Sequence, residues 1–311
     1  MRILREVEAM RESSTALSPA DGQADFYAQN GYLIVEDVLG ADELAELEAD
    51  LLKLARGGYG VTGIEPVAVG ASDAETLERI LCIHMPHFVS PVVRRFTAHP
   101  RLTRVLGQIV GAHLRPGLWN GGVKCMQSMF FAKPPGKPGQ AWHQDECFIP
   151  TRDRSLCAAW IAIDDAAEDN GCLRVIPGSH LAGTLYPFRE HSRGDEFDPT
   201  PESHGFDESG ETAIELRAGS VLFFNGYLLH RSRRNTSSRY RRALVNHYMS
   251  TQSPLHWCLD QELAGGGRHD SDNRSVHVVC GEDPYTERGY TVPANPVYLR
   301  EYIEHGEAAP A

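Results

Sequence analysis

A change in the pattern of apolar residues near residue 124 is the feature that most constrains the fold. Before it, apolar residues recur at helical spacing. After it, the chain consists of short apolar runs separated by Gly, Pro, Asn and Asp, which is typical of β-strands joined by turns. These strand-like runs are 124–132, 157–163, 172–176, 213–216, 221–224 and 243–249. Helices followed by many short strands predict an all-β core with helices packed on it, an α+β arrangement.

The N-terminal part is expected to supply the supporting helices. A polar leader over residues 1–22 precedes them, and residues 23–311 are predicted to form one domain. Expected elements are a helix over 25–30 that ends at Gly31, a strand over 32–35, and helices over 41–56, 91–98 and 101–110. Two long polar segments, 184–211 and 264–288, interrupt or follow the β part. Segments of this length are lids, binding loops or inert insertions.

Composition narrows the location and the partners. The formal net charge of −12 argues against a nucleic-acid binder, which needs a basic surface. The chain has no apolar run of signal-peptide length and none long enough to cross a bilayer. Seven scattered cysteines, an odd number without a CxxC pair, indicate reduced thiols. We therefore expect a cytoplasmic protein with no membrane partner.

The sequence Trp-His-Gln-Asp over 142–145 is the first candidate for chemistry. In a strand, residues two apart share a face, so His143 and Asp145 can approach one metal ion. Two histidines and one carboxylate form the facial set that holds non-haem Fe(II) with open positions. The best distant partner is His230, which follows the apolar run 221–224. The alternatives are a solvated carboxylate and a histidine that merely belongs to the core or a strand edge.

A basic run after His230 suggests an anion anchor. Six arginines fall within residues 231–242 of an otherwise acidic chain. Most of them are expected to be a solvated turn, but one buried guanidinium would hold a carboxylate with two hydrogen bonds. Arg241 precedes the apolar run 243–249, and Ser232 offers a hydroxyl for the same carboxylate. 2-oxoglutarate, which chelates iron through its keto-acid end, leaves such a carboxylate to be held.

At this point the sequence resembles the phytanoyl-CoA dioxygenase-like (PhyH) family of Fe(II)/2-oxoglutarate-dependent oxygenases, over about residues 26–248. The resemblance rests on the order and spacing of several pieces. They are the entry segment 26–54, the stretch 127–136, the Trp-His-Gln-Asp motif, the stretch 160–180, and the pattern formed by His230, Ser232, Asn235, Ser237 and Arg241.

The resemblance implies a fold, a ligand set and an activity. The fold is a double-stranded β-helix (jelly-roll, cupin-like) supported by N-terminal helices, with the metal and cosubstrate core at 123–250. His143, Asp145 and His230 would bind Fe(II). Arg241 and Ser232 would hold the distal carboxylate of 2-oxoglutarate, with Lys133 and Trp160 near the cosubstrate and Gln127 near the substrate. The expected activity is hydroxylation of a small metabolite or natural-product intermediate by O2, releasing succinate and CO2, with ascorbate as the reductant in vitro.

The residue at position 145 bears on the outcome of the reaction. Halogenating relatives carry a small residue where this chain has Asp145, so oxygenation is expected. His180 is interpreted as shaping a turn, and His247 could face either side of its strand.

Alternatives to this interpretation remain at the sequence level. They are a cupin-like metalloenzyme that does not use 2-oxoglutarate, a hydroxylase of an acyl-CoA thioester, a non-catalytic ligand-binding module, and a protein or nucleic-acid hydroxylase. The sequence predicts neither the substrate nor the oligomeric state.

Overall fold

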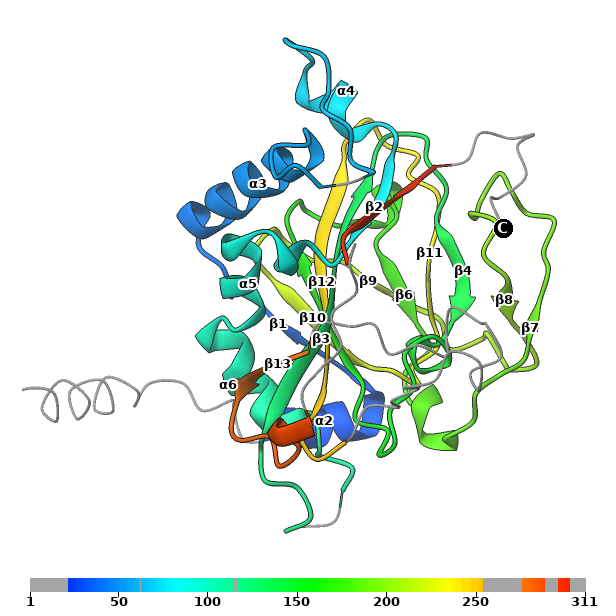
Figure 1. Cartoon of the computed structure of the whole chain (residues 1–311). Coiled ribbons are helices and arrows are strands. Elements are labelled where there is room, and N and C mark those ends of the chain that lie inside the picture. Colours follow the sequence, from blue (N-terminus) through cyan, green and yellow to red (C-terminus); the bar gives the residue numbers. More distant parts are fainter. Residues whose placement is uncertain (1–21, 62, 115–116, 254–275, 289–295, 303–311) are drawn as a thin grey trace, which may run out of the picture.

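Two antiparallel sheets face each other and form the centre of the molecule (Figure 1). This computed structural model describes residues 22–61, 63–114, 117–253, 276–288 and 296–302. The larger sheet has the order β1-β10-β5-β12-β3-β2-β14, with β13 also paired to β3. Its strands are β1 (Tyr32–Val35), β2 (Ile80–His84), β3 (Val123–Lys133), β5 (Cys157–Ala162), β10 (Val221–Asn225), β12 (Arg241–Ser250), β13 (His277–Cys280) and β14 (Tyr298–Glu301).

The smaller sheet has the order β4-β11-β6-β9 and faces the inner side of the larger one. Its strands are β4 (Gln140–His143), β6 (Leu173–Val175), β9 (Thr212–Ile214) and β11 (His230–Ser232). A separate pair, β7 (Phe188–Arg189) and β8 (Glu202–Ser203), lies beside β4 in the predicted polar segment 184–211. That segment therefore has a defined place next to the smaller sheet.

Helices cover the outer face of the larger sheet (Figure 1). They are α2 (Gln23–Asn30), α3 (Ala41–Ala55), α4 (Asp73–Leu77), α5 (Pro91–Thr97) and α6 (Pro100–Ile109). Their ends follow the local chemistry of the sequence. The Ser90 hydroxyl accepts a hydrogen bond from Val93 N at 2.8 Å at the start of α5. Gly31, with φ of 78°, ends α2 in the left-handed conformation that glycine adopts without strain.

Alternation along the central strand β12 separates two apolar cores. Leu244 and Tyr248 point to the helix side, where they join the side chains of α3, α5 and α6. Ala243 and Val245 point to the inner side, between the two sheets. Because successive side chains of a strand alternate between faces, one strand supplies both cores. The space between the sheets is therefore lined by β12 and its neighbours.

The predicted α+β arrangement is confirmed, and most predicted elements agree with the structure within one or two residues. Elements that the sequence did not suggest are α4, β2, β7, β8, β11, β13 and β14, together with the 3-10 turns η1 (Pro86–Phe88), η2 (Asp145–Cys147), η3 (Glu168–Asn170), η4 (Ser179–Ala182) and η5 (Thr286–Arg288). The predicted leader, apart from residue 22, and residues 264–275 lie outside the described residues. Among the helices of the described residues, none has both the length and the apolar character needed to cross a bilayer.

Candidate metal centre and cosubstrate pocket

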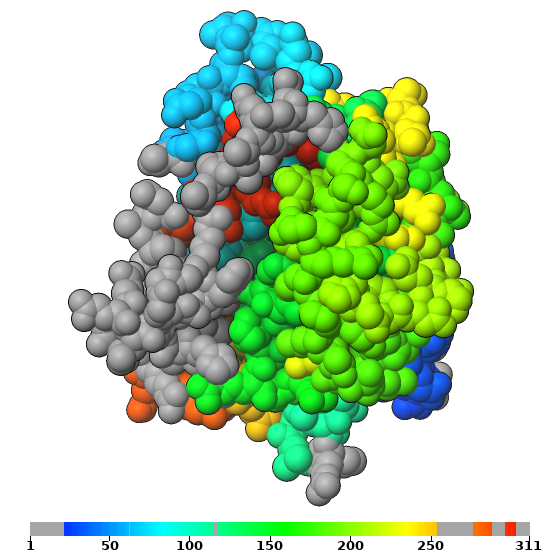
Figure 2. Space-filling view, turned by 90° about the vertical axis from the view of Figure 1, so that its right-hand side faces the viewer, coloured from blue at the N-terminus to red at the C-terminus, as the bar shows by residue number. Residues whose placement is uncertain are grey.

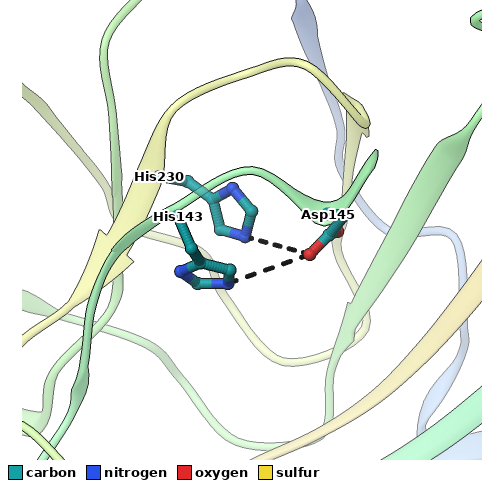
Figure 3. A group of neighbouring side chains, drawn as sticks. All are labelled: His143, Asp145 and His230. Carbon is teal, nitrogen blue, oxygen red and sulfur yellow. Dashed lines mark ion pairs between the residues drawn. The ribbon is translucent and has the colours of Figure 1, made fainter. Parts of the chain in front are cut away.

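Strand pairing in the smaller sheet brings the two candidate histidines together. β11 runs antiparallel to β4, and His230 is the direct cross-strand partner of His143. Their ring centroids are 4.1 Å apart. Asp145 Oδ1 lies 3.8 Å from His143 Nε2 and 3.6 Å from His230 Nε2 (Figure 3). One ligand atom from each of the three residues lies within 4.8 Å of the others, so the group could hold a metal ion.

Asp145 reaches this position by a different route from the one expected. The expectation of one strand carrying both His143 and Asp145 is wrong, because β4 ends at His143 and Asp145 begins η2. Its carbonyl oxygen accepts hydrogen bonds from Phe148 N at 2.9 Å and Ile149 N at 3.0 Å. This tight turn directs the carboxylate back toward the end of β4. The two side chains still converge, but through the turn.

Backbone carbonyls select the tautomer of both histidines. His143 Nδ1 lies 2.8 Å from Ala141 O, and His230 Nδ1 lies 2.9 Å from Leu228 O. A carbonyl oxygen can only accept, so each Nδ1 carries the proton and donates it. Each Nε2 then keeps its lone pair for a metal ion, as in many histidine metal sites.

The ionisation states of His143 and Asp145 favour the binding of a cation. Burial, followed by the neighbouring His230, lowers the pKa of His143 to about 3, so this ring is neutral near pH 7. Burial alone would raise the pKa of the Asp145 carboxyl, but the His230 and His247 imidazoles outweigh it and hold that pKa well below its usual range. Two imidazoles and one carboxylate are the ligand set that favours non-haem Fe(II).

A second cluster contains two buried basic side chains. Arg241 on β12 is the cross-strand partner of Lys133 on β3, and both side chains are buried. Lys133 Nζ donates to Ser232 Oγ at 2.9 Å and to Arg233 O at 2.7 Å. Burial, followed by Arg241, lowers the pKa of Lys133 well below its usual range. Burial also lowers the pKa of Arg241.

Arg241 has no carboxylate partner among the described residues. Its Nε atom is buried without a hydrogen bond to any of them, and its guanidinium carbon lies 5.3 Å from the centre of the Trp160 ring. A buried guanidinium without an anion is costly to the protein. The cluster of Arg241, Lys133 and Ser232 therefore suits the binding of a carboxylate from a small molecule.

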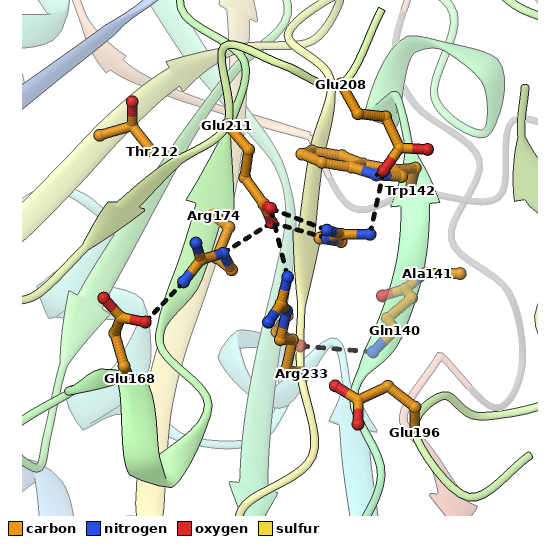
Figure 4. Close-up of polar contacts among 12 residues, drawn as sticks. Gln140, Ala141, Trp142, Glu168, Arg174, Glu196, Glu208, Glu211, Thr212 and Arg233 are labelled. Atoms are coloured by element: carbon orange, nitrogen blue, oxygen red, sulfur yellow. Dashed lines mark hydrogen bonds and ion pairs between the residues drawn. The ribbon is translucent and has the colours of Figure 1, made fainter. Parts of the chain in front are cut away.

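The rest of the basic run is in part the expected solvated turn, because Arg233 and Arg239 are exposed. Arg231, by contrast, is buried, makes a two-pronged ion pair with Glu211 through Nε at 2.7 Å and Nη2 at 2.8 Å, and stacks on Trp142. Figure 4 shows Arg233 directed toward the same Glu211. Other arginines of the run also pair with acidic side chains: Arg239 with Asp169, and Arg242 with Asp164 and Glu48. Arg241 differs from these four arginines, because it makes no ion pair with a carboxylate of the described residues.

The remaining predicted residues occupy different positions. Trp160 lies between the sheets beneath Arg241, and Gln127 is buried on β3 opposite His247. His180 lies in the 3-10 turn η4, and its Nε2 lies 3.0 Å from Ala28 O of α2. The sequence left open which side of its strand His247 faces. In the structure its side chain points inward, and its Nε2 lies 3.1 Å from Asp145 Oδ2.

Sequence reasoning missed the role of Gln144. Its buried carboxamide donates to Thr184 O at 2.9 Å and to Tyr227 O at 2.7 Å, and it accepts from Tyr186 N at 2.9 Å. Gln144 stands between His143 and Asp145, so it fastens the start of the segment 184–211 directly to the candidate metal centre. The partners are backbone atoms, so no residue type in the sequence signals this contact.

Comparison with known proteins gives the family. The sequence model of the phytanoyl-CoA dioxygenase (PhyH) family matches residues 27–243. The chain belongs to this family. It is 28% identical over 270 residues to a phytanoyl-CoA dioxygenase of Arabidopsis thaliana, covering 76% of this chain and 91% of that protein. It is 27% identical over 237 residues to a probable alpha-ketoglutarate-dependent hypophosphite dioxygenase of Stutzerimonas stutzeri, covering 75% of this chain and 79% of that protein.

Solved structures support the fold. The non-haem alpha-ketoglutarate-dependent carbocyclase SnoK from nogalamycin biosynthesis superposes with a TM-score of 0.59 at 20% identity, covering 85% of this chain and 97% of that chain. The predicted jelly-roll fold and the predicted enzyme class, an Fe(II)/2-oxoglutarate-dependent oxygenase, are confirmed by the family and the fold together.

Proposed function

We propose that this oxygenase hydroxylates a C–H bond of a small metabolite or natural-product intermediate, with His143, Asp145 and His230 as the Fe(II) ligands. The observation that carries the proposal is that two groups of side chains share strand β11, which contributes His230 to one and Ser232 to the other. One group offers two imidazole nitrogens and a carboxylate to a metal ion, and the other offers the basic side chains of Arg241 and Lys133 with the hydroxyl of Ser232 to an anion. A chelating keto acid with a distal carboxylate needs both.

Each residue has a distinct part in this proposal. The iron and 2-oxoglutarate supply the oxidising power, using O2 and releasing succinate and CO2. The protein positions them. His143 and His230 present fixed Nε2 lone pairs. Arg241 binds the distal carboxylate in a pocket from which Trp160 excludes water, and Ser232 donates to the same carboxylate while it accepts from Lys133.

The substrate side is proposed to lie over the aromatic residues beside His143. Phe148 lies edge-on to His143, with ring centroids 6.3 Å apart, and Phe188 of β7 lies 5.5 Å from Phe148. Figure 2 shows the segment 184–211 at the surface of the molecule, on the side of the smaller sheet. Apolar rings beside the metal favour a substrate with a carbon skeleton to pack against them. We propose that segment 184–211 is the lid over this substrate and that Gln127 contacts the substrate from β3.

Two further points belong to the same proposal. Residues 23–311 are proposed to form one domain, with the metal and cosubstrate core at 123–250. The location is proposed to be cytoplasmic, which agrees with the free thiols of the described cysteines.

Succinate formation from 2-oxoglutarate, with Fe(II) and with ascorbate as reductant, tests the proposed sites. Wild type is compared with His143→Ala, Arg241→Ala and the matched control Arg242→Ala, whose side chain points to the helix side. We expect turnover in wild type and in the control, and loss in the other two. Equal turnover in all four proteins would refute the assignment.

A second measurement separates this proposal from a metalloenzyme that does not use 2-oxoglutarate. Calorimetry with an inert divalent metal should show 2-oxoglutarate binding that depends on Arg241. A panel of candidate substrates then compares substrate classes by how much product forms for each succinate released. The panel includes acyl-CoA thioesters, because several relatives are named phytanoyl-CoA dioxygenases.

A further inference from the structure

We propose that His247 is a positioning residue that orients the carboxylate of Asp145 by donating a hydrogen bond from Nε2 to Oδ2. The inference rests on the proposed metal role of Asp145. It concerns a residue outside the proposed ligand set, on a different sheet from His143 and His230.

The two oxygens of Asp145 face different neighbours. Oδ1 is the oxygen near the other two candidate ligands, at 3.8 Å from His143 Nε2 and 3.6 Å from His230 Nε2. Those separations leave room for an ion between the atoms. Oδ2 instead lies 3.1 Å from His247 Nε2, which is a hydrogen-bond distance. The carboxylate thus has one oxygen for the metal and one for His247.

The second nitrogen of each ring distinguishes the ligands from the donor. In His143 and His230 a backbone carbonyl takes the Nδ1 proton and leaves Nε2 as a lone pair. In His247 the buried Nδ1 has no hydrogen-bond partner among the described residues. Nothing in the described structure therefore holds the proton on Nδ1, and the carboxylate oxygen opposite favours the proton on Nε2. His247 is placed to donate and not to ligate.

His247 lies in a central strand, whereas Asp145 lies in a short turn. β12 is flanked by β3 and β5, and His247 pairs with Gln127 on one side and Ala158 on the other. A bulge in the β3 ladder follows directly after His247, which re-aims the side chains at this level. Asp145 belongs to a one-turn 3-10 segment. A donor on a central strand therefore fixes a carboxylate on a turn.

The functional consequence concerns metal binding. A hydrogen bond to the outer oxygen keeps the carboxylate from rotating about its Cβ–Cγ bond and holds Oδ1 toward the two imidazoles. Partners of this kind change metal affinity by about 10–100-fold when they are removed. Loss of His247 should therefore weaken metal binding without removing a ligand.

The test compares a variant that removes the donor with one that restores it. His247→Leu has no donor, whereas the amide nitrogen of His247→Gln lies the same number of bonds from the backbone as Nε2 of histidine. The control is His277→Leu. His277 is another partly buried histidine of the larger sheet, but it contacts Thr97 and not Asp145. Co(II) and Fe(II) dissociation constants are measured by competition with a chelator, together with the visible spectrum of the Co(II) form and the unfolding midpoint of the metal-free protein.

We expect His247→Leu to bind metal about 10–100-fold more weakly with an altered Co(II) spectrum, His247→Gln to recover most of the affinity, and His277→Leu to match wild type. Wild-type affinity in His247→Leu overturns the proposal, and so does an equal loss in the Leu and Gln variants. If His247→Leu does not fold, His247→Gln alone tests the proposal. Metal affinity and a Co(II) spectrum close to those of wild type support it, and an affinity as weak as that predicted for His247→Leu overturns it. If the wild-type protein binds neither Co(II) nor Fe(II), the proposed function fails as well. Asp145→Ala then gives the same result as wild type in the metal-binding assay.

Discussion

Replacing Arg241 with methionine should separate stability from cosubstrate binding. Methionine keeps much of the length and apolar volume of the side chain but carries no charge. In the metal-free protein the guanidinium is buried, and its Nε lacks a partner among the described residues. Removing an uncompensated buried charge regains several kcal/mol of desolvation, and losing the contact with Trp160 costs about 1–2 kcal/mol. The free energy of unfolding without ligands should therefore stay equal or rise by about 1–2 kcal/mol.

Binding should change in the opposite direction. The same substitution removes a charge-assisted, two-pronged anchor for a carboxylate, worth about 3 kcal/mol or more. That corresponds to a dissociation constant for 2-oxoglutarate weakened by about 100-fold or more. Arg242→Met is the matched control, because Arg242 is the next residue and bonds to Asp164 at 2.8 and 2.6 Å on the other side of the strand. It should lose stability and keep 2-oxoglutarate binding.

Thermal unfolding with and without 2-oxoglutarate, in the presence of an inert divalent metal, measures both effects in one assay. Wild type at 100 times the dissociation constant should gain about 2.7 kcal/mol, and Arg241→Met should gain almost nothing at the same concentration. The reasoning is refuted if Arg241→Met keeps the full gain from 2-oxoglutarate, or if its ligand-free form loses as much stability as Arg242→Met.

Three further predictions concern other parts of the structure. Gln144→Leu removes three buried hydrogen bonds, so it should cost about 2–4 kcal/mol and speed proteolytic cleavage within 184–211; unchanged cleavage would contradict the role of Gln144 as a fastener. Burial, with Arg94 and His87 nearby, lowers the pKa of His277 to about 3, below the value of about 6.5 in an unfolded chain. Between these values the unfolded state binds more protons, so stability falls as the pH falls. Wild type should lose about 2 kcal/mol more than His277→Gln between pH 7 and 5 in urea titrations, and parallel curves would refute this. Adding a divalent metal at 100 times its dissociation constant should raise the free energy of unfolding by about 2.7 kcal/mol, and the gain should vanish in a variant without one of the two strand histidines.

The sequence was sufficient to predict the features that depend on residue chemistry and on the periodicity of apolar residues. The short runs 221–224 and 243–249 are strands because their apolar residues lie between turn-forming residues. His143, His230 and Arg241 were singled out because their types and spacing match a known need for imidazoles and an anchor. The structure brings the first two together and buries the third.

Other features could not be predicted because they depend on tertiary geometry. The run 80–84 is apolar and short, so periodicity alone does not identify it as β2. Asp145 was placed on a strand because alternation was the simplest rule, whereas backbone hydrogen bonds curl it into a turn. The partners of Gln144 are carbonyl and amide groups of distant segments. The facing of His247 depends on the register of β12 with β3.

The position of β4 at the edge of the smaller sheet adds a structural consequence to the candidate metal centre. An edge strand has a ladder of hydrogen bonds on one side only, and β4 has its ladder with β11. His143 and His230 face each other across that single seam. An ion bound by both would act as a cross-link between segments far apart in the chain, much as a disulfide closes a long loop. Loading the enzyme with metal should then also stabilise the pairing of β4 with β11.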